Sequence, residues 1–156
     1  MNDFHLHHVN VNVDDLDAAV AFYRDVIGLP LDTTPDQGFR SQFFRLGSNA
    51  QIHMNEIADV HQFRGHFCLI APDFPAVFAR AKAANAIDVR PWGRVRRLPN
   101  GAMQMFVRDP AGNLVEIGSH KDAKIDPALF ADELVEPKPG MYRMAPGAEV
   151  GAHESR

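Results

Sequence analysis

The sequence predicts an α+β fold built from two copies of a β-α-β-β-β module. Two alignments within the chain carry this prediction. Residues 8–29 (HVNVNVDDLDAAVAFYRDVIGL) align without a gap with residues 66–87 (HFCLIAPDFPAVFARAKAANAI), and residues 44–54 align with residues 107–117. In both copies a short strand-like segment precedes apolar residues at helical spacing, which indicates the same order of elements twice.

The first copy begins with a strand and a helix. Residues 7–13 alternate polar and apolar side chains, as expected for a strand with one buried face. Asp14 and Asp15 can cap a helix that starts at Leu16 and runs to Ile27, and Gly28 is a natural helix stop. Turn residues then separate three further strands, which we expect near 29–34, 39–46 and 50–55.

The second copy repeats this order and is followed by an extension. We expect a strand at 66–71, a helix at 74–85 capped by Asp73, and strands near 87–97, 102–108 and 113–118. The modules, about 5–56 and 64–119, would form a single domain of residues 1–119. Residues 120–156 would be a C-terminal extension, with a short helix from Asp126 to about Leu134 and an irregular tail.

Composition excludes several classes of protein. The chain has 156 residues, 46% of them hydrophobic, which suits one globular domain with its own core. A net charge of −4 gives no general attraction to nucleic acid. The single cysteine, Cys68, excludes an internal disulfide and fits a reducing compartment. No apolar run is long enough to span a bilayer and the start lacks a signal-peptide pattern, so we expect a cytoplasmic protein without a membrane partner.

The duplication places four potential metal ligands at equivalent positions. His8 aligns with His66 on the first strand of each copy, and His53 aligns with Glu116 on the last. Ile52 flanks His53 on a strand, so the ligand candidates should face away from the helix-covered side. Imidazoles and a carboxylate suit a divalent ion such as Zn, Ni, Fe, Co or Mn, and discriminate poorly among them. The sequence therefore predicts a metal site.

A different interpretation exists for each of these residues. A lone histidine on a strand is more often a hydrogen-bonded or surface residue than a ligand, and only the repeat symmetry argues otherwise. His7 is the immediate neighbour of His8, so an exchange of roles between them stays open. Other residues also have a functional and a structural interpretation. Asn10 and Asn12 would be cavity side chains or surface side chains, and Cys68 is more often a small buried residue than a nucleophile or ligand. Arg94, Arg96 and Arg97 would clamp an anion or belong to a solvated hairpin.

Three segments resemble a known superfamily. HHVNVNVDDLDAAVAFYRDVIGLPL (7–31) resembles the opening module of the vicinal oxygen chelate superfamily, which includes glyoxalase I, fosfomycin-resistance proteins, methylmalonyl-CoA epimerase, extradiol dioxygenases and bleomycin-resistance proteins. GHFCLIAPDF (65–74) resembles the start of its second module, and FVRDPAGNLVEI (106–117) its closing motif. The resemblance covers about residues 5–119 and implies paired βαβββ modules that form an incomplete barrel around a metal ion.

The resemblance also implies a ligand set and a partner. His8, His66 and Glu116 match the family's metal ligands, and His53 stands where metal-binding glyoxalase I has a second glutamate. Single-domain members often complete the cavity in a homodimer, with the first-strand histidine from one subunit and the second-module ligands from the other. We therefore expect a homodimer that acts on a small-molecule substrate.

The expected chemistry is that of a glyoxalase-like lyase or isomerase, acting on a substrate chelated through adjacent oxygens. Glu116 would be the base as well as a ligand, and His53 is the second candidate for either role. An extradiol-type ring-cleaving dioxygenase is an alternative, favoured by two histidines with one carboxylate and opposed by the extra histidine. A metal-free drug-binding resistance protein is a further alternative, although a pure binder does not need the ligand set.

Overall fold

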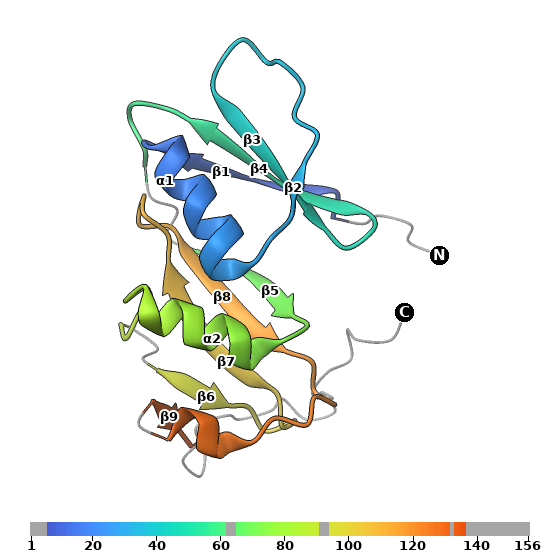
Figure 1. The fold of residues 1–156 in the computed structure, drawn as a ribbon, viewed down its shortest axis with the longest axis vertical. Coiled ribbons are helices and arrows are strands. Elements are labelled where there is room, and N and C mark those ends of the chain that lie inside the picture. Colours follow the sequence, from blue (N-terminus) through green and yellow to red (C-terminus); the bar gives the residue numbers. More distant parts are fainter. Residues whose placement is uncertain (1–5, 62–64, 91–93, 132, 137–156) are drawn as a thin grey trace. The chain divides into compact units, whose positions relative to one another are not determined.

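The computed structural model describes residues 6–61, 65–90, 94–131 and 133–136. The chain divides into two compact units, each with its own sheet and helices (Figure 1). The first contains residues up to His66 together with Arg108–Leu114, and the second contains Phe67–Val107 and the residues from Val115 onwards. Within the described ranges, no helix has the length and apolar character needed to cross a bilayer.

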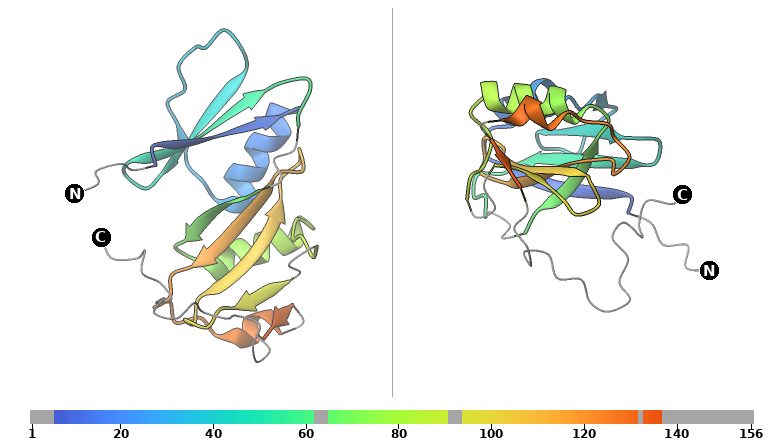
Figure 2. Two further views of the ribbon diagram at one scale, coloured as in Figure 1. Left: turned by 180° about the vertical axis from the view of Figure 1, so that it is seen from behind. Right: turned by 90° about the horizontal axis from the view of Figure 1, so that it is seen from below.

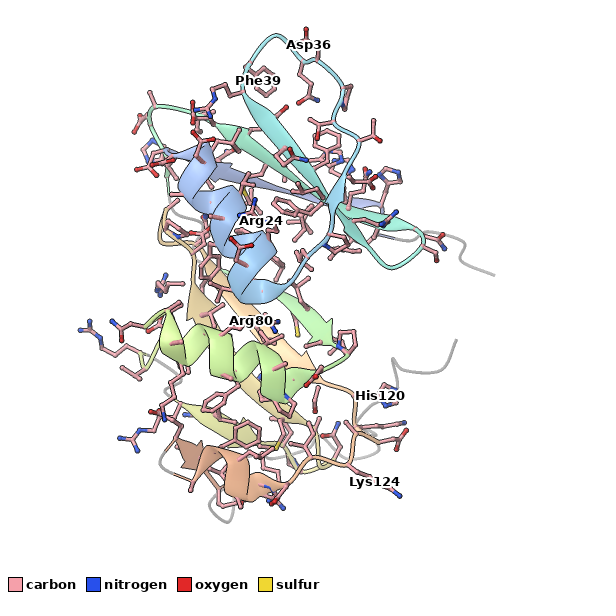
Figure 3. The ribbon with its side chains drawn as sticks, in the orientation of Figure 1. Arg24, Asp36, Phe39, Arg80, His120 and Lys124 are labelled. Carbon is pink, nitrogen blue, oxygen red and sulfur yellow. The ribbon has the colours of Figure 1, made fainter. Side chains whose placement is uncertain are left out.

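The first unit contains a four-stranded sheet in the order β1-β4-β3-β2. Strand β1 runs parallel to β4, and β3 runs antiparallel to both β4 and β2. The loop between β2 and β3 carries Asp36 and the exposed Phe39 (Figure 3). The elements are β1 (His8–Val13), α1 (Leu16–Ala21), η1 (Phe22–Ile27), β2 (Leu31–Asp32), β3 (Ser41–Leu46) and β4 (Ala50–Glu56).

The first helix begins and ends at the predicted residues but is not one regular α-helix. The Asp15 side chain accepts a hydrogen bond from the Ala18 N–H at 2.9 Å, as its N-cap role predicts. After Ala21 the chain continues as a π-helical segment, η1, so the prediction of a continuous α-helix over 16–27 is wrong in its second half. Gly28 then adopts a φ of 91°, the left-handed conformation that ends the segment.

One face of the first sheet is covered by α1 and η1 (Figure 1). Phe44, Ile52, Met54 and Tyr23 are fully buried in this unit. Because strand residues alternate between faces, the side chains between these strand residues point to the opposite face. A carboxylate from the end of β4 joins sheet and helix: Glu56 accepts from the Leu16 N–H at 2.9 Å. A negative charge is favourable at that end of a helix.

The second unit repeats this topology with an added strand. Its sheet has the order β5-β8-β7-β6-β9, and β5 runs parallel to β8 as β1 does to β4. Helix α2 lies over one face of the sheet (Figure 2), capped by Asp73, which accepts from the Ala76 N–H at 3.0 Å. The elements are β5 (Phe67–Ala71), α2 (Phe74–Ala83), β6 (Val95–Arg97), β7 (Met103–Arg108), β8 (Leu114–Ser119), η2 (Pro127–Phe130) and β9 (Leu134–Val135).

The predicted α+β fold of two βαβββ modules is confirmed, with corrections in the second module. Among the described residues of the expected strand at 87–97, Ile87 forms a single bridge with Val107, and Val95–Arg97 form the short β6. Arg94, just before β6, has a φ of 62°, which a continuous strand does not allow.

The extension also differs from its prediction. The short helix expected at 126–134 is a single 3₁₀ turn, η2. Leu134 instead opens β9, which pairs in parallel with β6 and so adds the extension to the second sheet. The predicted irregular tail lies beyond Glu136, outside the described residues, and the domain boundary at 119 stays a prediction.

Candidate metal and catalytic site

His53 lies in the middle of β4 with its ring between two other rings. The Phe43 ring stacks on it with centroids 3.6 Å apart and planes at 4°, and the His8 ring stacks on it at 4.1 Å and 10°. Its strand neighbours Ile52 and Met54 are fully buried, whereas His53 is half-buried. His53 therefore occupies the sheet face opposite the helix, and its ring plane is held on both sides.

The first unit brings His8 and His53 together, because their rings stack with centroids 4.1 Å apart. His8 is exposed at the start of β1. His7, its predicted alternative, contacts His8 instead of His53: the two Nδ1 atoms are 3.0 Å apart and the rings meet edge to face. A nitrogen–nitrogen contact of this length needs one protonated nitrogen and one lone pair, so His7 restricts which nitrogens of His8 are free.

The surroundings of His53 favour a neutral imidazole. Partial burial lowers the pKa of His53 below its ordinary 6.5, and the neighbouring His8 and His7 add to this effect. Desolvation and like charges both disfavour the protonated ring. A neutral imidazole is the form that binds metal ions or accepts a proton, so His53 is in the competent state at neutral pH.

A hydrogen-bonded chain leads from His53 to the edge of the sheet. Gln51 Oε1 lies 2.9 Å from His53 Nε2, and Gln51 Nε2 donates to Asp32 Oδ2 at 2.9 Å. Beyond this chain lies a polar pocket of about 430 Å³. Its walls include the sheet residues Asp32, Arg45 and Gln51 and the turn residues Ser48 and Asn49. A polar group of a ligand held near His53 could therefore find both charges and hydrogen bonds here.

Glu116 occupies the equivalent position in the second unit. It is half-buried on β8 between the buried Val115 and Ile117, and its Oε1 accepts from Gln104 Nε2 at 2.5 Å. Desolvation, the Glu116 charge and a hydrogen bond with Glu116 raise the pKa of Cys68 to about 12. Cys68 is exposed, so the expectation of a small buried residue is wrong, and its raised pKa keeps the thiol protonated at neutral pH and so a poor nucleophile.

The four predicted ligands are thus divided over the fold. His8 and His53 lie on the first sheet, Glu116 lies on the second, and the exposed His66 immediately precedes β5. In the part of the chain that the structure describes, no three histidine, cysteine, aspartate or glutamate side chains are grouped to hold a metal ion. The convergence of the four on one ion stays a prediction.

Three of the other candidate residues, Asn10, Asn12 and Arg97, have structural partners. Asn10 Oδ1 accepts from Asn55 at 2.8 Å, and Asn10 Nδ2 donates to Asn12 at 2.9 Å, so this face of β1 and β4 carries an amide network. Arg97 pairs with Glu136 of the extension at 3.3 Å. These contacts favour the structural interpretation of the arginine and leave the asparagines as polar residues on the face of His53.

Sequence reasoning missed the glutamines beside the two central residues. Gln51 lies two positions before His53 in the same strand, so strand alternation alone could have placed it on the same face. Gln104 and Asp32 carry no such local signal. They reach Glu116 and Gln51 from β7 and β2, and the strand register that brings them there is not readable from the sequence.

The donor set suits a divalent metal by its chemistry. Neutral imidazole and carboxylate are ordinary ligands of Zn, Fe, Ni, Co and Mn. His8 and His53 are stacked face to face, however, and the lone pairs of parallel rings lie in separate planes. Joint binding of one ion therefore requires a rotation of one ring. His8 is the candidate, since it is exposed while His53 is held by Phe43 and Gln51.

The paired modules and the open sheet faces are those of the glyoxalase fold, and comparison with known proteins agrees. The chain belongs to the Glyoxalase/Bleomycin resistance protein/Dioxygenase superfamily, whose model matches residues 5–117. Its sequence is 30% identical to that of a lactoylglutathione lyase from Agrobacterium tumefaciens whose crystal structure is known. The two structures have a TM-score of 0.57, and the match covers 80% of this chain and 98% of the other.

One further relative supports this assignment, and a second solved structure shares the fold. A probable lactoylglutathione lyase from Vibrio cholerae is 27% identical over 135 residues, which is 79% of this chain and 96% of that protein. A putative glyoxalase family protein from Bacillus anthracis shares the fold, with a TM-score of 0.61 at 20% identity over 77% of this chain and 99% of the other. The family predicted from the three sequence motifs is therefore confirmed.

Proposed function

We propose that this protein is a metal-dependent enzyme of the glyoxalase type, a lyase or isomerase that acts on a small substrate chelated through adjacent oxygens. The observation that carries the proposal is the pair of equivalent positions, His53 on β4 and Glu116 on β8, each on a strand face between buried neighbours. The lactoylglutathione lyase relative, 30% identical over most of both chains, supports the choice of reaction class.

His8, His66 and Glu116 would hold the metal, and His53 would be either a fourth ligand or a base. The ion would supply a positive charge that polarises the chelated oxygens of the substrate. The protein's own residues would move the proton. Glu116 is a carboxylate and His53 a neutral imidazole, so each can take a proton from a carbon beside the chelated oxygens and return it to the neighbouring carbon.

The protein would work as a homodimer in the cytoplasm. The proposal of a dimer rests on the assembly that the superfamily resemblance implies. The cytoplasmic setting is supported by the single free cysteine, Cys68, whose protonated thiol is compatible with a reducing compartment. Light scattering on the purified protein tests the dimer, and a monomer would contradict it.

Elemental analysis of protein purified without added ions tests the metal site. We expect about one divalent ion per chain in the wild type and loss of that ion in His8→Ala and Glu116→Ala, because each variant removes a ligand. His61→Ala is the matched control, since His61 is exposed and pairs only weakly with Asp59 at 3.4 Å. A full metal content in both ligand variants would defeat the site.

Activity measurements separate this function from its two alternatives. Metal-dependent formation of lactoylglutathione, or isomerisation of a related small substrate, would support the proposal. Bound iron together with oxygen uptake on addition of catechols would replace it with a ring-cleaving dioxygenase. Tight binding of an aromatic drug by a protein that binds no metal would replace it with a resistance protein.

A further inference from the structure

The protonation of His53 can be deduced from its neighbours. Its ring plane is fixed by Phe43 on one face and His8 on the other. A neutral imidazole carries one proton, either on Nε2 or on Nδ1, and a hydrogen bond at one nitrogen decides which. His53 Nε2 has such a bond, to Gln51 at 2.9 Å.

The direction of that bond is set by Asp32. Gln51 Nε2 donates to Asp32 Oδ2 at 2.9 Å. Hydrogen bonds from Gln51 and from the Thr33 N–H lower the pKa of Asp32, so its carboxylate is ionised and can only accept. The amide nitrogen of Gln51 must therefore face Asp32, and its oxygen must face His53.

An amide oxygen cannot donate a hydrogen bond, so His53 Nε2 must carry the proton. The lone pair is then on Nδ1, which has no hydrogen-bond partner among the described residues. We propose that Gln51, held by Asp32, is a positioning residue that fixes the Nε2-protonated tautomer of His53 and leaves Nδ1 to bind the metal or take the substrate proton. The role of Nδ1 rests on the proposed function, whereas the tautomer stands on these contacts alone.

A nitrogen-15 NMR spectrum of the metal-free protein, labelled at histidine, tests the tautomer directly. Protonated and unprotonated ring nitrogens have well-separated shifts, and the His53→Gln variant identifies the His53 signals. We expect the wild type to show a protonated Nε2 and an unprotonated Nδ1. In Gln51→Leu the acceptor is gone, and we expect a mixture of both tautomers.

Replacement of Asp32 provides a sharper variant that preserves shape. In Asp32→Asn the oxygen would stay on the Thr33 N–H, and the new amide group would face Gln51. Gln51 must then turn its oxygen to residue 32 and its amide nitrogen to His53, so the tautomer of His53 should reverse. Gln42→Leu is the control: Gln42 also bonds to Asp32, through the Asp32 carbonyl at 3.2 Å, but none of its hydrogen bonds to the described residues goes to His53.

Cobalt binding connects the tautomer to function. If His53 is a ligand, Gln51→Leu should weaken Co²⁺ affinity by about 10- to 100-fold, the usual effect of losing a residue that orients a ligand. If His53 is the base, Gln51→Leu should lower kcat and leave Co²⁺ affinity and KM unchanged. Wild-type behaviour in all three quantities would remove the functional role of Gln51.

Failure of this inference and failure of the proposed function give different results. A wild-type His53 protonated at Nδ1, or a tautomer that does not respond to Gln51→Leu and Asp32→Asn, would overturn the positioning role even if the metal site is present. A protein that binds no metal and converts no substrate would overturn the proposed function, and the NMR result would still decide the tautomer.

Discussion

The two central residues of the candidate site differ in charge but share one kind of neighbour. His53 and Glu116 occupy equivalent positions in the repeat, and each has a glutamine within hydrogen-bonding distance. Gln51 turns its oxygen to the imidazole, and Gln104 turns its amide nitrogen to the carboxylate. A glutamine therefore accepts a hydrogen bond from the imidazole in one module and donates one to the carboxylate in the other. The equivalent position of the repeat can for this reason hold either a histidine or a glutamate.

A buried pair elsewhere in the first unit gives a stability prediction at the level of single residues. The Tyr23 hydroxyl donates to Asp109 Oδ2 at 3.1 Å, and both residues are buried. Tyr23→Phe removes this donor from a desolvated carboxylate. We expect a loss of about 1.5–3 kcal/mol in the free energy of unfolding, measured by urea denaturation at neutral pH.

The loss should depend on pH. Burial raises the pKa of Asp109 above its ordinary 3.8, so the folded protein holds this proton more tightly than the unfolded chain and gains stability as pH falls through the raised pKa. The Tyr23 hydroxyl stabilises the charged form of Asp109. The cost of Tyr23→Phe should therefore be smaller below pH 3.8 than at neutral pH, and it should shrink in an Asp109→Ala background. An equal cost under all three conditions would contradict the pairing.

At the scale of elements, the repeat and the strand alternation predicted most of the fold. Both helix caps, Asp15 and Asp73, hold the first turns that the sequence assigned to them. The errors fall where tertiary contacts decide. No local pattern separates the π-helical η1 from a regular helix, and β9 is a strand of two residues that exists only because β6 is beside it.

The candidate site could be predicted in part for the same reason. In the parallel register of β1 with β4, His8 lies opposite Gln51 and His53 lies opposite Asn10, so the two histidine rings are diagonal neighbours that stack on one face. Asp32 could not be found, because its bond to Gln51 depends on how β2, a two-residue strand, pairs with β3. Residues that hydrogen-bond to a candidate ligand are often distant from it in sequence, whereas the candidate ligands themselves stand at equivalent positions of the repeat and can be found from it.

The C-terminal extension should contribute to the stability of the second unit through one buried ring. Phe130 of η2 is fully buried against Phe74 and Phe78 of α2, with ring centroids 5.7 and 4.9 Å apart. Phe130→Ala should cost about 3–5 kcal/mol in unfolding free energy, because a large buried ring leaves a cavity. Leu129→Ala is the matched control: Leu129 is 57% exposed, and we expect a change within about 0.5 kcal/mol. Similar small losses in both would mean that the extension is not part of the core.

At the scale of the whole molecule, the duplication divides the proposed metal site. The first unit carries His8 and His53 on its open sheet face, and the second carries Glu116 on the corresponding face. Neither unit holds the full ligand set. The proposed site therefore requires that a first unit and a second unit meet, either within one chain or between the two chains of a dimer, and these arrangements can be separated experimentally.

Mixed dimers distinguish the two arrangements. His8→Ala and Glu116→Ala, unfolded together and refolded as an equal mixture, should form heterodimers as about half of the population. If each site takes His8 from one chain and Glu116 from the other, every heterodimer contains one site with both residues intact and one site that lacks both. Metal content should then recover to about a quarter of the wild-type value, because half of the dimers each regain one of two sites. If each site lies within one chain, every site lacks one ligand and no metal should return, which would contradict the shared site. A mixture of His8→Ala with itself, refolded in the same way, is the control for the procedure.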